Sequence, residues 1–252
     1  MSKYAVITGA SSGLGVEFAK YLSKKEYKLI LIARREERLK KLASRLKTEC
    51  EIISADLTEE SECYRVWEVI KNKEIEIFIN NAGFGDSGCF IDCDLDKELN
   101  MVQLNVKAVH IFSKLALCKM QERNKGYILN VASCAGLMPG GPYMATYYAT
   151  KAYVTSLTRG IAEELRENGS NVYVGCLCPG PVATEFNKVA NVKFSIPQIR
   201  ADYCVKYALK QMEKRKVVII PTFRMKLFMT AGRYVSPSLY VKIAANQQAK
   251  DI

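Results

Sequence analysis

The chain has 252 residues, of which 49% are hydrophobic, and a formal net charge of +11. This length and composition fit one globular domain, and no low-complexity tract, internal repeat or linker divides the sequence. No apolar run is long enough to cross a bilayer. The single histidine lies far from any cysteine pair and the nine cysteines form no C-x-x-C motif, which argues against a zinc site.

Short apolar runs alternate with helical stretches along the whole chain. Strands are predicted at residues 4–7, 28–33, 51–56, 75–80, 127–131, 171–178 and 217–220, and helices at 16–22, 36–46, 61–71, 97–122 and 147–168. This alternation predicts an α/β fold, a single Rossmann-type domain with a doubly wound parallel sheet of about seven strands and helices on both faces. Ligands of such sheets bind beyond the carboxyl ends of the strands, so we expect the functional residues there.

A glycine-rich turn follows the first predicted strand, where residues 8–15 read T-G-A-S-S-G-L-G. Gly9 permits a tight turn, Gly13 lets the backbone approach a nucleotide, and Gly15 lets the helix pack on the sheet. The free N–H groups at the start of that helix would face a pyrophosphate. A strand, a glycine turn and a helix start in this order indicate a dinucleotide site.

Tyr147 and Lys151 are four residues apart in the helix predicted at 147–168. Side chains at this spacing lie on one face of a helix. A free tyrosine has a pKa of about 10, and a cation within about 4–6 Å lowers it by stabilising the phenolate. We therefore expect Tyr147 to be a general acid-base whose pKa Lys151 lowers. Alone, the pattern also fits a packed tyrosine beside a solvated lysine.

His110 is the only histidine, and the chain has no G-x-S-x-G turn, which argues against a serine hydrolase. We expect His110 to be packed within its helix, and Cys176 and Cys178 to lie in the core. For Cys134, packing and exposure to oxidants both remain open. The first predicted strand begins too early in the sequence for a signal peptide, so we expect a cytoplasmic protein with reduced thiols.

These residues and several others occur in an order that resembles the short-chain dehydrogenase/reductase family, from about residue 3 to residue 222. The shared motifs are the turn at 8–15, Asp56 after the third strand, residues 80–83 after the fourth, Asn105, Ser133, Tyr147 with Lys151, and residues 179–184. Each motif is weak alone, but their common order is specific. The resemblance implies that residues 1–222 form a Rossmann-fold catalytic domain.

The resemblance also implies a role for each of four catalytic residues. Tyr147 would donate a proton to a carbonyl oxygen as hydride leaves the nicotinamide, and Lys151 would also bind the nicotinamide ribose. Ser133 would orient and polarise the substrate oxygen. Asn105 would hold a water molecule that links Lys151 to solvent. Without the resemblance, Ser133 could merely cap a turn and Asn105 could be a polar helix residue.

The end of the second predicted strand bears on cofactor choice. It reads Arg34-Arg35, with no carboxylate before Glu36. An acidic residue there would bind the ribose 2′-OH of NAD, whereas arginine accommodates the 2′-phosphate of NADP. We predict NADP(H), although both arginines also fit the start of a solvated helix face. The expected cofactor contacts are Gly9, Ser11, Ser12, Gly13, Leu14, Gly15, Arg34, Arg35, Asp56, Leu57, Asn81, Ala82, Gly83, Tyr147, Lys151, Pro179, Gly180, Val182 and Thr184.

The segment after Thr184 is apolar and should border the substrate. It contains Phe186, Val189, Val192, Phe194 and Ile196. An apolar segment favours an apolar carbonyl or secondary alcohol, such as a steroid, an aliphatic ketone or an acyl chain. Core contacts of a lid helix would explain the same residues equally well. The substrate and the direction of reaction stay open.

Residues 223–252 extend beyond the shared motifs and are basic and apolar around a break at Ser236 and Pro237. We predict a C-terminal helical extension that packs on the same domain, where it could cover the substrate cleft, or on a partner subunit. We favour both over a membrane surface. Basic and acidic residues alternate elsewhere and no recognition motif is present, so we expect no nucleic acid partner. The family commonly dimerises through the helices that carry Asn105 and Tyr147, which implies a homodimer or homotetramer.

We therefore predict an NADP(H)-dependent oxidoreductase that interconverts a carbonyl and a secondary alcohol of a small, apolar molecule without a metal ion. The alternative is a catalytically silent regulatory or scaffold protein that binds a nucleotide. Such a protein would have no physical need for Asn105, Ser133, Tyr147 and Lys151 together.

Overall fold

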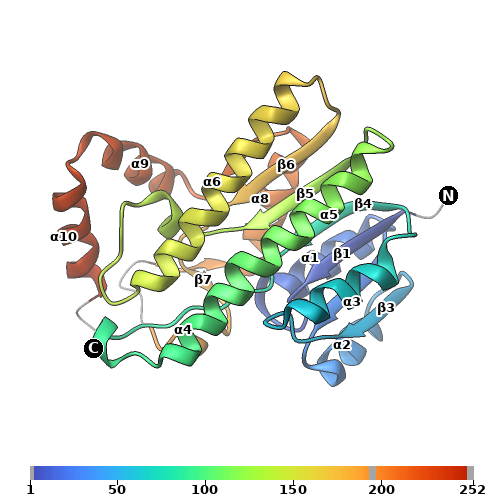
Figure 1. Cartoon of the computed structure of the whole chain (residues 1–252), viewed down its shortest axis with the longest axis horizontal. Coiled ribbons are helices and arrows are strands. Elements are labelled where there is room, and N and C mark those ends of the chain that lie inside the picture. Colours follow the sequence, from blue (N-terminus) through green and yellow to red (C-terminus); the bar gives the residue numbers. More distant parts are fainter. Residues whose placement is uncertain (1–2, 193–196, 249–252) are drawn as a thin grey trace.

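Seven strands form one parallel sheet in the order β3-β2-β1-β4-β5-β6-β9 in the computed structural model, which describes residues 3–192 and 197–248 (Figure 1). The strands are β1 (Tyr4–Thr8), β2 (Lys28–Ala33), β3 (Cys50–Ser54), β4 (Ile75–Asn80), β5 (Gly126–Val131), β6 (Val172–Leu177) and β9 (Val218–Ile219). The chain moves outward from β1 to β3 and then returns to place β4 on the other side of β1. This confirms the predicted doubly wound sheet and puts its switch point between β1 and β4.

Helices cover both faces of the sheet, because successive strand side chains point to opposite faces. Ala5 and Ile7 of β1 belong to the core with helices α1, α2 and α8, whereas Val6 belongs to the core with α3, α5 and α6. The helices are α1 (Gly13–Lys24), α2 (Glu36–Ala43), α3 (Glu60–Ile70), α5 (Val109–Gln121), α6 (Ala145–Glu167) and α8 (Ala201–Glu213). Burial on both faces explains why the strands are continuous apolar runs rather than alternating ones.

The helix predicted at 97–122 is present but irregular. It consists of α4 (Leu95–Val102), a π-helical segment η2 (Gln103–Ala108) and α5. A π-helical turn inside a longer helix is rare and occurs frequently at functional sites. Asn105 lies in this segment and is fully buried. A hydrophobic period of 3.6 residues does not distinguish such a turn from regular helix, so the sequence pattern did not reveal it.

A buried polar network fixes α6 against the sheet. Asn80 Nδ2 of β4 donates to Asn130 Oδ1 of β5 at 2.8 Å, and Asn130 Nδ2 donates to Thr158 Oγ1 of α6 at 3.0 Å. Gly136, in the 3₁₀ turn η3 (Cys134–Leu137), lies against the same helix. A Cβ at Gly136 would be 2.2 Å from the backbone oxygen of Lys151. The network and this close approach hold α6 in a fixed position at the carboxyl ends of the strands.

The region after β6 contains short elements that the sequence pattern did not predict, followed by helices in the predicted C-terminal extension. The short strands β7 (Val182–Ala183) and β8 (Ile199–Arg200) pair in a separate sheet, and α7 (Phe186–Val189) follows β7. The C-terminal helices α9 (Phe223–Ala231) and α10 (Pro237–Gln248) lie beyond α6, at the end of the molecule opposite β3 (Figure 1). The rings of Phe228 and Tyr240 pack together at 5.6 Å between centroids.

Expectations for four single residues can be compared with the structure. The histidine prediction was wrong, because His110 is exposed on α5 and its Nδ1 lies 2.7 Å from the hydroxyl of Tyr153. Cys134, Cys176 and Cys178 are all buried. Within residues 3–192 and 197–248, no helix combines the length and hydrophobicity of a transmembrane segment, and no cluster of side chains suits a metal ion.

Candidate active site

A cleft of about 390 Å³ opens beyond the carboxyl ends of the central strands. Its walls come from the glycine turn after β1 and from the segments that follow β2 to β6. All of the predicted cofactor contacts line this cleft except Gly15. The motifs are far apart in the sequence, but the parallel sheet brings them to one edge.

The glycine turn has the backbone geometry that its residues predicted. Gly9 has φ of +66° and Gly13 has φ of +53°, a region that favours glycine. Gly15 packs instead of lining the cleft, because a Cβ there would be 2.3 Å from the carbonyl oxygen of Gly9. Among the described residues, the side chain of Ser12 makes no capping bond at the start of α1. The first N–H groups of α1 can therefore bind phosphate oxygens.

Asn81 supports the turn from the neighbouring strand. Its Nδ2 donates to the carbonyl oxygens of Thr8 at 2.9 Å and Gly9 at 3.2 Å, and its backbone N–H donates to Thr8 Oγ1 at 2.9 Å. These bonds fasten the end of β4 to the turn after β1. The side chain of Asn81, predicted as a cofactor contact, thus also positions the turn.

Tyr147, Lys151 and Ser133 meet on the inner wall of the cleft. Tyr147 is 8% exposed and Lys151 is 5% exposed, on the same face of α6. The ammonium nitrogen of Lys151 lies 5.8 Å from the centre of the Tyr147 ring and donates to the Val131 carbonyl at 2.9 Å. Ser133 hydrogen-bonds the Tyr147 hydroxyl, and its Oγ also accepts the Ala135 N–H at 3.1 Å. Ser133 therefore caps η3 and contacts the phenol at the same time.

Burial controls the charge of both groups on α6. Burial raises the pKa of Tyr147 well above its ordinary value, and the bond from Ser133 only partly opposes this. The spacing of Lys151 predicts a lowered pKa for Tyr147, and this prediction is wrong because burial outweighs any effect of the nearby cation. Burial also lowers the pKa of Lys151 to about 8. At neutral pH Tyr147 is therefore a protonated phenol, the form that can donate a proton.

Asn105 lies close to Lys151 but does not line the cleft. Its Oδ1 accepts the Phe84 N–H at 3.1 Å, and its Nδ2 donates to the Phe84 carbonyl at 2.8 Å and to Thr150 Oγ1 at 3.1 Å. A Cβ at Gly83 would be 2.8 Å from Asn105 Oδ1 and 3.4 Å from Lys151 Nζ. The π-helical segment η2 thus brings Asn105 close to Lys151. The predicted water relay from Lys151 to solvent would have to pass through this place.

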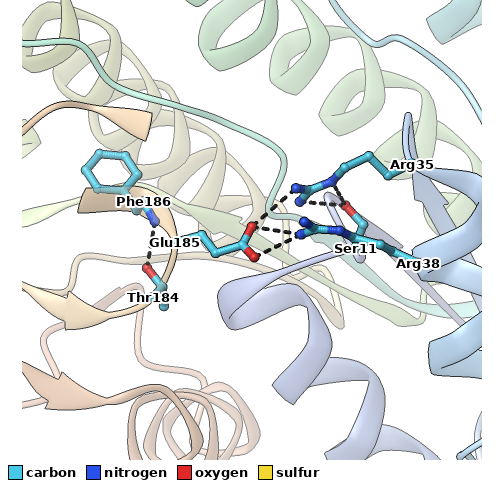
Figure 2. A network of polar contacts seen from close by, with 6 residues as sticks. All are labelled: Ser11, Arg35, Arg38, Thr184, Glu185 and Phe186. Atoms are coloured by element: carbon cyan, nitrogen blue, oxygen red, sulfur yellow. Dashed lines mark hydrogen bonds and ion pairs between the residues drawn. The ribbon is translucent and has the colours of Figure 1, made fainter. Parts of the chain in front are cut away.

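Three arginines line or border the adenosine end of the cleft. Arg34 pairs with Asp56 at 3.5 Å, and Arg35 donates to Ser11 Oγ at 3.2 Å. Arg38 was not predicted, although it lies one helical turn after Arg35. Arg35 and Arg38 both contact Glu185, from the segment between β7 and α7 (Figure 2). The signal for Arg38 was its i+3 spacing from Arg35.

The other end of the cleft is apolar. The ring of Phe186 packs on that of Tyr147 at 5.4 Å between centroids. Phe186 and Val189 line the cleft as predicted, whereas Val192 is buried beside Ala190 in a core cluster. Phe194 and Ile196 lie outside the described residues. The large side chains that line the cleft without having been named individually include Phe84, Met138, Met144, Tyr148, Met225 and Phe228.

A profile of the family described as short chain dehydrogenase matches residues 3–193. The chain belongs to the short-chain dehydrogenase/reductase family. A very-long-chain 3-oxoacyl-CoA reductase from Anas platyrhynchos is 35% identical over 206 residues, which are 78% of this chain and 65% of that relative. The chain therefore spans slightly less than two thirds of the length of this curated relative.

Solved structures share the fold of this short-chain dehydrogenase/reductase over almost the whole chain. A short-chain dehydrogenase from Sphingobium yanoikuyae in complex with NADPH has a TM-score of 0.82 and 30% identity, covering 93% of this chain and 94% of that one. A family member from Burkholderia phymatum in complex with NAD has a TM-score of 0.84 and 22% identity, covering 98% and 96%. The second likeness shows the fold alone.

Proposed function

We propose that this short-chain dehydrogenase/reductase is an NADP(H)-dependent enzyme that interconverts the carbonyl and the secondary alcohol of an apolar substrate. The observation that carries the proposal is the convergence of Tyr147, Ser133 and Lys151 between a glycine-lined nucleotide groove and an apolar wall. An acid group, an oxygen-binding hydroxyl and a cation at this junction suit hydride transfer to a carbonyl. A bound nicotinamide supplies the hydride.

Each side chain has a separate task in the proposed reduction. Tyr147 donates its phenolic proton to the substrate oxygen, which avoids a free alkoxide in a dry site. Ser133 holds the same oxygen by a hydrogen bond. Lys151, when protonated, stabilises the resulting phenolate and binds the nicotinamide ribose. Asn105 keeps Lys151 connected to solvent, so that Tyr147 regains its proton.

The proposed preference for NADP(H) follows from charge at the adenosine end. Arg34, Arg35 and Arg38 supply three positive charges there, against Asp56 and Glu185. Guanidinium groups bind phosphate oxygens in fork-like pairs. A dianionic 2′-phosphate adds favourable contacts at this point that a 2′-hydroxyl group does not.

The apolar end of the cleft is the reason for proposing a bulky or chain-like apolar substrate. Phe186, Met225 and Phe228 line the same cleft as Tyr147 and offer no charge to a ligand. The similarity to 3-oxoacyl-CoA reductases supports including 3-oxoacyl thioesters beside steroids and aliphatic ketones. No substrate within this group is favoured by a particular contact.

The direct test is NADPH oxidation measured with a panel of 3-oxoacyl thioesters, steroids, aliphatic ketones, quinones and aldehydes. We expect turnover with at least one apolar carbonyl compound, and faster turnover with NADPH than with NADH. Nucleotide binding with no turnover on any carbonyl compound or on the matching alcohols would favour the silent binding protein instead.

A further inference from the structure

Glu185 connects two walls of the cleft that are distant in the sequence. Its Oε2 lies 3.2 Å from Arg35 Nη1, and both of its carboxylate oxygens lie 2.9 Å from Arg38 Nη1. The arginines belong to the adenosine side, after β2. Glu185 belongs to the substrate side, between β7 and α7 (Figure 2).

Arg35, Arg38 and Ser11 form a site that suits an anion. Arg35 donates through Nε and Nη2 to Ser11 Oγ, both at 3.2 Å, while its Nη1 contacts the carboxylate. The bond from Arg38, followed by that from Arg35, holds the pKa of Glu185 below its usual range, so the group is ionised at neutral pH. Guanidinium groups recognise carboxylate and phosphate with the same donors. The Glu185 carboxylate therefore occupies a place that a phosphate group would take.

The residues on either side of Glu185 contact the rest of the site. Thr184 packs on the glycine turn, where a Cβ at Gly13 would be 3.3 Å from its side chain. Phe186 donates its backbone N–H to Thr184 Oγ1 at 3.3 Å, and its ring packs on Tyr147. A displacement of Glu185 would therefore move Phe186, whose ring packs on Tyr147, the proposed proton donor.

We propose that Glu185 determines cofactor specificity by competing with the 2′-phosphate of NADP(H) for Arg35 and Arg38. This inference rests on the proposed NADP(H) function. A 2′-phosphate has a larger negative charge and displaces the carboxylate, which frees the β7–α7 segment and Phe186. A 2′-hydroxyl has no charge to displace it, so with NAD(H) the segment stays joined to the arginines.

The test compares the binding of adenosine 2′,5′-bisphosphate and 5′-AMP by calorimetry, which requires no catalysis. In Glu185→Gln the competing charge is lost but the side-chain size is kept. Exposed charge pairs are modest in strength, so we expect the bisphosphate to bind about three- to tenfold more tightly and 5′-AMP to change less than about twofold. Glu163→Gln is the matched control, because Glu163 is an exposed glutamate paired with Arg166 at the far end of α6.

A second measurement follows the segment itself by hydrogen exchange at residues 185–189. NADP⁺ should increase exchange there in the wild type and NAD⁺ should not, whereas Glu185→Gln should exchange fast with both. Weaker bisphosphate binding in the variant, or an equal change for both nucleotides, would overturn the inference. A Glu185→Gln protein that prefers the bisphosphate, where the wild type shows no preference, would support the inference. The same binding and exchange results in a protein that reduces no carbonyl compound would also support it, although the proposed enzymatic function would then fail.

Discussion

The charge states of two buried residues determine how the site works at a given pH. Tyr147 and Lys151 share one face of α6, and burial favours the neutral form of each. In the proposed reduction the neutral phenol donates the proton, whereas a neutral Lys151 amine would not stabilise the resulting phenolate. Under the proposed mechanism, the titration of Lys151 near pH 8 would therefore limit the reaction.

We expect kcat/KM for carbonyl reduction to fall as the pH rises through about 8. Lys151 has a pKa lowered to about 8 by burial, so its ammonium form is present below that pH and is lost above it. Tyr147 stays protonated over this range because its pKa is raised. Lys151→Arg keeps the charge at all these pH values and should lose the inflection, even if its rate is lower. The same inflection in the arginine variant would assign it to another group.

Arg34→Ala should weaken NADPH binding far more than NADH binding. One charge-assisted contact to the 2′-phosphate is lost, which corresponds to about ten- to hundredfold in affinity. Fluorescence titration with both cofactors measures the ratio. Arg45→Ala is the control, because Arg45 is exposed just beyond α2 and does not line the cleft. Equal weakening of both cofactors would show that Arg34 does not bind the phosphate.

At the scale of single elements, the start of α1 and the middle of α6 differ in whether a glycine there can be replaced by alanine. A Cβ at Gly15 would be 2.3 Å from a backbone oxygen, whereas a Cβ at Gly160 meets no described atom within 4 Å. The first glycine sets the distance between the helix and the glycine turn. The second occupies an open position in a regular helix.

Gly15→Ala should lower the free energy of unfolding by about 1–3 kcal/mol, because the start of α1 must move. It should also weaken binding of both cofactors equally. Gly160→Ala is the matched control and should raise stability by about 0.4–1 kcal/mol, since alanine is the better helix residue. Chemical denaturation of both variants measures the difference. A Gly15→Ala protein as stable as Gly160→Ala would contradict the close packing.

The sequence predicted the elements of the sheet and the residues that carry short local motifs. Gly9, Tyr147 and Lys151 were found because their spacing within one turn or helix has a chemical reason. Glu185 and Arg38 were missed as partners because their contact joins segments 147 residues apart. The pKa of Tyr147 was wrongly expected to be low because burial, unlike helical spacing, depends on packing around the whole site.

At the scale of the whole molecule, helix α9 forms part of the apolar wall of the cleft. Met225 and Phe228 of α9 line the cleft, and Lys226 donates to the Tyr207 hydroxyl of α8 at 2.8 Å. On the outer surface, Phe223 is 78% exposed and Tyr234 is 88% exposed. We propose that these exposed rings contact a partner subunit in a homo-oligomer.

A chain ending at Thr222 should still bind NADP⁺ but lose carbonyl reduction and scatter more light. It keeps the glycine turn and the arginines, but loses one wall of the substrate cleft and uncovers apolar surface. A chain ending at Gln248 is the control and should match the full length in activity and oligomeric state. Full activity of the shorter chain would contradict this account. If the full-length protein floats with anionic liposomes and the chain ending at Thr222 does not, the result would instead support a membrane contact.

Single-turnover NADPH oxidation shows most directly whether Tyr147 supplies the proton in carbonyl reduction. Tyr147→Phe keeps the ring and removes only the transferable proton, so turnover should fall by about 10²–10⁴ while NADPH binding is retained. Tyr153→Phe removes a hydroxyl from an exposed position on the same helix and should leave the rate unchanged. A Tyr147→Phe protein that turns over at nearly the wild-type rate would contradict the account.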